Sequence, residues 1–127
     1  MSQENGSYVP DVFKHELILV IREQDELVVF TGCSHNGILN MVETVEKLFK
    51  GERIKVVFGG FHMMNPATKK MTETHEEVLK IGRLLSEKTH LKKVFTGHCT
   101  GKKAYEILKS QMGEKLGSFA TGSVMSI

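Results

Sequence analysis

Three stretches share one pattern: VVFTGCSH at residues 28–35, VVFGGFH at residues 56–62 and VFTGHCTG at residues 94–101. Each begins with β-branched or aromatic residues, passes through a glycine turn and reaches an imidazole or a thiol. Ligands of open α/β sheets bind outside the carboxyl ends of the strands, and glycine allows sharp turns and close approach there. We therefore expect the three turns to meet at one edge of a sheet.

The rest of the chain alternates between strand and helix patterns. Residues 16–22 and 27–31 are rich in β-branched residues and are joined by a short polar link, which predicts a hairpin. Helical periodicity and capping residues predict three helices, over residues 41–49, after Thr72 or Thr74 as far as residue 85, and over residues 102–112. Residues 117–127 are expected to return as one or two short strands. This order predicts an α/β fold whose sheet is mixed because of the hairpin.

The composition predicts one globular domain. The chain has 127 residues, 40% hydrophobic and 25% charged, which is ordinary for a soluble protein. We interpret residues 1–7 as a polar, flexible N-terminus and residues 8–127 as a single domain. No signal peptide is recognisable, so the expected compartment is the cytoplasm. An apolar run long enough to span a membrane is absent from the sequence.

Charge and cysteine content exclude two classes of protein. The net charge is +2, and the lysine pairs at residues 69–70, 92–93 and 102–103 are spread along the chain, so a nucleic-acid partner is not expected. Two cysteines do not form a disulfide framework. Because Cys33 and Cys99 both lie in turns that contain glycine and histidine, a ligand or reactive role is favoured over a structural bridge.

The strand-end turns supply the candidate functional residues. His35 and His98 follow glycine turns that are hard to explain as packing, and imidazole and thiolate are common donors for zinc. Cys33 lies two residues before His35, so an extended segment would direct both side chains to the same side. His62 is equally consistent with a functional role and with packing beside Met63 and Met64.

Other candidates favour a structural interpretation. Cys99 directly follows His98, so in an extended chain its side chain would point elsewhere, and we expect it to be a small buried residue. His75 and His90 lie on or beside a charged helix and are expected at the surface. Composition alone places His15, just before the first strand of the hairpin, at the surface as well.

Four motifs resemble one group of metallo-β-lactamase proteins. They are DVFKHELILVI at residues 11–21, TGCSHNGILN at 31–40, GGFH at 59–62 and TGHCTG at 96–101. The group comprises metal-dependent hydrolases that are often labelled 7,8-dihydropterin-6-yl-methyl-4-(β-D-ribofuranosyl)aminobenzene-5′-phosphate synthases. The resemblance runs from residue 8 onward and implies the C-terminal half of an αββα sandwich. The His-x-His-x-Asp-His motif of the family's N-terminal half is missing.

The resemblance also implies roles for individual residues. His15 corresponds to a histidine before a strand, Cys33 to the strand-end residue that bridges two metals, and His98 to the last histidine of the family. His35, from a motif of the subgroup, is either a ligand or a neighbour of the ligands, and His62 is a proton donor or a substrate contact. The turn amides could hold an anionic group, those of Gly32, Gly59, Gly60 and Gly97.

The expected function is metal-dependent hydrolysis. A divalent cation, zinc first and iron or manganese as alternatives, would activate water for attack on an ester or phosphoester of a small molecule. Without the other half of the fold an apolar sheet face would be exposed, so we expect a homo-oligomer or a separate N-terminal half as partner. The alternatives are a catalytically inactive half-domain that binds a partner or ligand, and a thiol-based site at Cys33 or Cys99.

Overall fold

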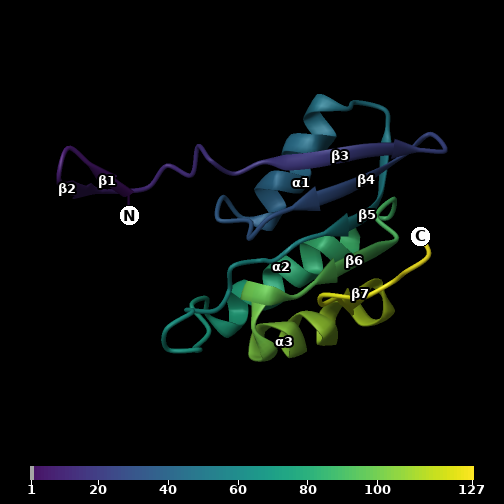
Figure 1. The fold of residues 1–127 in the computed structure, drawn as a ribbon. Helices are drawn as coiled ribbons and strands as arrows, with labels where there is room; N and C mark the ends of the chain where they lie inside the picture. Colours follow the sequence, from purple (N-terminus) through teal and green to yellow (C-terminus); the bar gives the residue numbers. More distant parts are fainter. Residues whose placement is uncertain (1) are drawn as a thin grey trace.

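The computed structural model describes residues 2–127 and contains one five-stranded mixed sheet (Figure 1). The first pair of strands is antiparallel, and each later neighbour is parallel to the one before it. In sheet order the strands are β3 (Ile18–Glu23), β4 (Glu26–Thr31), β5 (Arg53–Phe58), β6 (Lys93–Thr96) and β7 (Leu116–Ser118). The prediction of an α/β fold with a mixed sheet is confirmed.

The hairpin of β3 and β4 is closed by a tight turn. Glu23 pairs with Glu26, and the two residues between them, Gln24 and Asp25, have positive φ angles of 48° and 64°. Two consecutive left-handed residues are typical of a type I′ turn, whose twist matches that of the flanking strands. The hairpin expected from the polar link is therefore present.

Three helices pack on one face of the sheet (Figure 1). They are α1 (Ile38–Leu48), α2 (His75–Glu87) and α3 (Lys102–Met112). Helix α1 buries Ile38, Met41, Val42 and Val45, the spacing of an apolar stripe on a helix. Ile38, Val42 and Val45 share one core with Val29 of β4 and with residues of the other two helices. The helices thereby cover one face of the four parallel strands β4, β5, β6 and β7.

Helix α2 begins at a capping box. The Thr74 side chain accepts a hydrogen bond from the Glu77 amide, and the Glu77 carboxylate accepts one from the Thr74 amide. This satisfies two of the amides that a helix start leaves unpaired, and it selects Thr74 over Thr72 as the cap. The hydrogen bond from the Thr74 amide is the main cause that lowers the pKa of the Glu77 carboxyl group.

The face of the sheet opposite the helices is apolar and partly open. Leu19 is 57% exposed and Ile21 45% exposed on β3. The rings of Phe30, Phe58 and Phe95 stack across β4, β5 and β6 with centroids 5.0 Å apart at each step. Phe119 lies edge-on to Phe58, and a cavity of about 370 Å³ opens between the tail and this face. The exposed apolar face expected from the sequence is present, and we call it the aromatic face.

Both ends of the chain carry short strands. Within residues 1–7, interpreted as a polar, flexible N-terminus, the structure has β1 (Ser2–Glu4) and the start of β2 (Ser7–Val9), which form a small antiparallel hairpin, and residue 1 lies outside the described residues. The turn residues Asn5 and Gly6 have positive φ angles of 49° and 81°, and an Asn-Gly pair is a strong hairpin signal. In the C-terminal segment the expected short strand is present as β7, and turns and irregular chain follow it.

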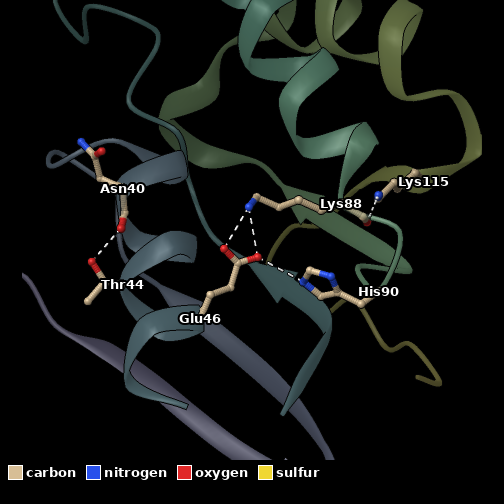
Figure 2. A network of polar contacts seen from close by, with 6 residues as sticks. All are labelled: Asn40, Thr44, Glu46, Lys88, His90 and Lys115. Atoms are coloured by element: carbon tan, nitrogen blue, oxygen red, sulfur yellow. Dashed lines mark hydrogen bonds and ion pairs between the residues drawn. The ribbon is translucent and has the colours of Figure 1, made fainter. Parts of the chain in front are cut away.

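A network of ion pairs joins the ends of the helices (Figure 2). Glu46 of α1 accepts hydrogen bonds from Lys88 Nζ at 2.9 and 3.0 Å and lies 3.1 Å from His90 Nε2. Lys115 donates to the Lys88 carbonyl at 2.7 Å. His90 is thus half-buried and paired, which corrects its expected surface position, whereas His75 is exposed as predicted. We call Glu46, Lys88, His90 and Lys115 the polar network.

None of the helices within residues 2–127 combines the length and the apolar character that crossing a bilayer requires.

Candidate metal centre

The three glycine turns meet at the carboxyl ends of β4, β5 and β6, as the sequence predicts. They are joined directly by backbone hydrogen bonds: the Gly60 amide donates to Gly32 O at 2.9 Å, and the Met63 amide donates to Cys99 O at 3.1 Å. Buried hydroxyls add to this frame, because Thr100 Oγ1 accepts from the Phe61 amide at 2.9 Å and lies 2.6 Å from Thr96 Oγ1. The turns therefore form one connected layer.

Three donor side chains come together in this layer. The ligand atoms of Cys33, His98 and Cys99 all lie within 4.8 Å of one another. Cys33 comes from the turn after β4, and the other two come from a short 3₁₀ helix, His98–Thr100, after β6. Cys33 and Cys99 are half-buried, and His98 is exposed. We call these three residues the metal centre.

The position of Cys99 corrects the sequence prediction. An extended chain would have sent the side chains of His98 and Cys99 in different directions, but residues 98–100 turn as a helix and His98 has a φ of 52°. That turn places both side chains beside Cys33. The prediction failed because it assumed that the strand continued past Gly97.

Backbone groups fix the Cys99 thiol. Its Sγ accepts a hydrogen bond from the His62 amide at 3.2 Å and lies 3.7 Å from the Cys33 carbonyl oxygen. Burial raises the pKa of this thiol to about 11, and the nearby Cys33 thiol adds to the rise, while the His62 amide opposes it. A bound cation acts in the opposite direction, since thiols that ligate metals are deprotonated.

Gly60 creates the space for this thiol. A Cβ atom at position 60 would lie 2.6 Å from Cys99 Sγ. The predicted anion-binding role fails for Gly59 and Gly60, however, because their amides already donate to Phe95 O and Gly32 O. The roles of Gly32 and Gly97 stay predictions.

The other predicted ligands lie beside the metal centre. The His35 and His62 rings stack with centroids 3.9 Å apart at 25°. His15 lies further out, with its ring 6.4 Å from that of His35, and Phe13 packs against His35 at 5.0 Å. Among the described residues, His15 and His35 are not part of the group of donors within 4.8 Å. The structure thus brings Cys33 and His98 together and leaves His15 and His35 as neighbours.

Glu16 is a positioning residue that the sequence analysis missed. Its carboxylate accepts hydrogen bonds from the His35 amide at 2.5 Å and from the Asn36 amide and side chain, both at 2.8 Å. These bonds tie the segment before β3 to the turn after β4, and so hold His35 and Cys33 in place. Nothing in the local pattern around Glu16 indicates a contact with residues so distant in sequence.

A cavity of about 350 Å³ lies over the metal centre. Lys69 is the cationic side chain that lines it. The Lys69 loop is closed by a bridge between Met64 and Met71 and by the Asn65 side chain, which accepts from the amides of residues 67 and 68 at 2.9 and 3.0 Å. The full lining combines donors and imidazoles with this cation: Cys33, His35, His62, Met64, Pro66, Lys69, His98 and Cys99.

The donor chemistry fits zinc. Thiolate and imidazole are the ligands that zinc prefers, and two cysteines with one histidine form one of the three-ligand sets of catalytic zinc sites, which leave a fourth position open. Hard oxygen ligands, which magnesium and calcium require, are not among the three donors. The residues present can therefore hold a borderline-soft divalent cation.

The chain is similar to known proteins over nearly its whole length. No family model matches the sequence. The crystal structure of Tm1679, described as a metal-dependent hydrolase of the β-lactamase superfamily, superposes with a TM-score of 0.84 at 34% identity, over 98% of this chain and 45% of Tm1679. Over nearly its whole length the chain is therefore similar to part of a protein of the β-lactamase superfamily. This confirms the expected fold class: the chain has an α/β fold like the matching part of Tm1679.

Two proteins of Methanocaldococcus jannaschii are also similar. The 7,8-dihydropterin-6-methyl-4-(β-D-ribofuranosyl)-aminobenzene-5′-phosphate synthase is 31% identical over 122 residues, which are 96% of this chain and 39% of that enzyme. The uncharacterized protein MJ0448 is 38% identical over 61 residues, 48% of this chain and 21% of that protein. The chain thus spans less than half the length of each of these relatives and of Tm1679.

Proposed function

We propose that this chain is the part of a metal-dependent hydrolase that provides Cys33, His98 and Cys99 as ligands of one divalent cation, zinc being preferred. The observation that carries the proposal is the convergence of these donor atoms within 4.8 Å beneath a cavity of about 350 Å³. The likeness to a metal-dependent hydrolase supports it. The name of the other relative is that of a synthase, so hydrolysis itself is the point to be tested.

When bound, such a cation lowers the pKa of coordinated water and polarises an adjacent substrate oxygen. The chain's own residues complete the chemistry. His62 lines the same cavity, where its imidazole can give a proton to a leaving group. His35 stacks on His62 and limits its rotation. Lys69 lines the cavity and favours an anionic substrate such as a phosphoester.

The aromatic face supports a second element of the proposal, a partner. Leu19 and Ile21 are exposed beside the Phe30–Phe58–Phe95 stack, and soluble proteins rarely leave contiguous apolar patches uncovered. The chain also accounts for 45% of Tm1679. We infer that a further portion of a metallo-β-lactamase fold covers this face and adds ligands to the centre, whether that portion belongs to the same polypeptide, another one or a second copy.

The test measures metal and turnover together. Tag-free protein is loaded with zinc, and its metal content is measured by elemental mass spectrometry. Hydrolysis of p-nitrophenyl phosphate, bis-p-nitrophenyl phosphate and p-nitrophenyl acetate is then followed with and without a chelator. His98→Ala should lose both metal and turnover, while His75→Ala, which removes an exposed histidine away from the centre, should keep both. A protein that binds no metal would contradict the proposal.

The same experiment separates the enzyme from a binding module. Stoichiometric metal without hydrolysis of any of the three substrates would contradict a hydrolase in this form of the chain and favour a non-catalytic ligand-binding role. Light scattering over a range of concentrations tests the partner. A monomer throughout would exclude self-association through the aromatic face.

A further inference from the structure

The two cysteines of the metal centre are also placed to react with each other. Cys99 Sγ lies 3.7 Å from the Cys33 carbonyl oxygen, so this thiol rests against the main chain of Cys33. The two sulfur atoms belong to the group of donors that lie within 4.8 Å of one another. Both thiols line the same open cavity, so a small reagent can reach them from solvent.

The surrounding chain allows the sulfur atoms to approach further. Gly60 lies between the two cysteines and places no side chain there. A Cβ atom at this position would lie 2.6 Å from Cys99 Sγ and 3.6 Å from Cys33 Cα. Glycine also precedes Cys33 and flanks the turn that carries Cys99, at positions 32, 97 and 101. A disulfide needs the two Cα atoms within about 7 Å, and glycine-flanked turns can adjust by the small displacement that bond formation requires.

We propose that Cys33 and Cys99 form a reversible intramolecular disulfide when the metal-free protein meets a small-molecule disulfide. One cysteine thiolate attacks a sulfur of the reagent and expels the first reagent thiol. The second cysteine then attacks the mixed disulfide and expels the second thiol. Two protein thiols are oxidised to one disulfide, one reagent disulfide is reduced to two thiols, and the two protons pass to those products.

The disulfide would control metal binding, a consequence that rests on the proposed function. Oxidation removes two of the three donors, because the thiolate is the form that binds a metal. Loss of even a supporting residue around a metal costs about 10- to 100-fold in affinity, so we expect the oxidised protein to bind zinc at least about 100-fold more weakly. Bound zinc should in turn protect both thiols from the reagent.

The experiment treats metal-free protein with oxidised glutathione and follows its intact mass. The expected product has lost two hydrogens, yields a cross-linked peptide pair containing Cys33 and Cys99, and returns to two thiols with dithiothreitol. Cys33→Ser and Cys99→Ser, shown by circular dichroism to be folded, should each stop at a mixed disulfide with one glutathionyl group. Wild-type protein that also stops there, or that stays reduced, would overturn the proposal.

Zinc-loaded protein separates this proposal from the metal proposal. Slower oxidation in the presence of zinc supports both. If the disulfide forms equally fast with and without zinc, the disulfide stands and the metal centre is contradicted. If zinc binds tightly but the metal-free thiols never join, the metal centre stands and the disulfide is wrong.

Discussion

The metal centre and the polar network lie at opposite ends of the same parallel strands. The polar network lies at the carboxyl ends of α1, α2 and α3, where the chain enters the next strand. There the polar side chains have partners within the protein: Glu46 contacts both Lys88 and His90, and Lys115 donates to the Lys88 carbonyl. At the metal centre, Cys33, His98 and Cys99 face one another and an open cavity. Charge satisfied within the protein indicates a structural role, whereas donors collected around a cavity indicate a ligand.

Removing a donor should have the largest effect. His98→Ala or Cys99→Ala is expected to weaken zinc binding by at least about 100-fold, because ligand loss should exceed the cost of losing a supporting residue. His90→Ala, in the polar network, should bind zinc like the wild type. Competition with a chromophoric chelator measures both affinities. If His90→Ala lost as much zinc affinity as these variants, the metal centre and the polar network would not differ in metal binding.

Removing the central carboxylate of the polar network should lower the stability of the protein and leave its zinc affinity unchanged. Glu46→Ala deprives Lys88 and His90 of their shared partner and is expected to lower the free energy of unfolding by about 2 kcal/mol. Its zinc affinity should not change. Urea denaturation provides the measurement, and Glu43→Ala, an exposed glutamate on the same helix, provides the control. A wild-type unfolding midpoint for Glu46→Ala would contradict a structural role.

A methyl group at Gly60 should disturb the metal centre without removing a donor. Gly60→Ala would place a Cβ 2.6 Å from Cys99 Sγ, so the thiol must move, and we expect a loss of about tenfold in zinc affinity, roughly 1.4 kcal/mol. Gly32→Ala is the matched control, since a Cβ there meets nothing within 4 Å. If both variants bind alike, the close approach of Gly60 has no part in positioning Cys99.

The pH dependence of zinc binding follows from the raised pKa of Cys99. With a pKa of about 11 instead of its ordinary 9.0, the metal-free thiol is protonated at neutral pH, and ligation must release that proton. Zinc affinity should therefore rise about tenfold for each unit of pH from this group alone, up to the raised pKa. Calorimetry in buffers of different ionisation enthalpy counts the released protons. Binding without proton release would exclude Cys99 as a ligand.

The raised pKa of Cys99 also determines how the stability of the metal-free protein changes with pH. Because the folded-state value lies above the ordinary one, Cys99 contributes stability that is present below pH 9.0 and lost as the pH rises towards 11. Metal binding and metal-free folding thus respond to pH in opposite directions.

Much of the layout was predictable from local pattern. The repeated run of apolar residues, glycine and an imidazole or thiol located three strand ends, because parallel strands place their carboxyl ends at one edge. The pattern correctly predicted that Cys33 and His98 lie close together. The Asn5-Gly6 turn carried a signal for the N-terminal hairpin that polar composition concealed.

Three features depended on information that local pattern does not contain. Cys99 joins the centre because residues 98–100 turn as a 3₁₀ helix, and a short apolar strand does not indicate how the chain continues after it. Glu16 and Lys69 act through contacts with segments distant in sequence. His90 is half-buried because Glu46 of another element lies beside it, which tertiary packing alone decides.

The most direct test of the metal centre is the absorption spectrum of the protein titrated with Co²⁺, a spectroscopic substitute for zinc. Thiolate ligation produces an intense near-ultraviolet charge-transfer band that imidazole and oxygen ligands do not give. We predict this band at one cobalt per chain in wild-type protein, reduced in Cys33→Ser and in Cys99→Ser and retained in Glu46→Ala. A wild-type spectrum without the band, or one unchanged by both serine variants, would contradict ligation by the two cysteines.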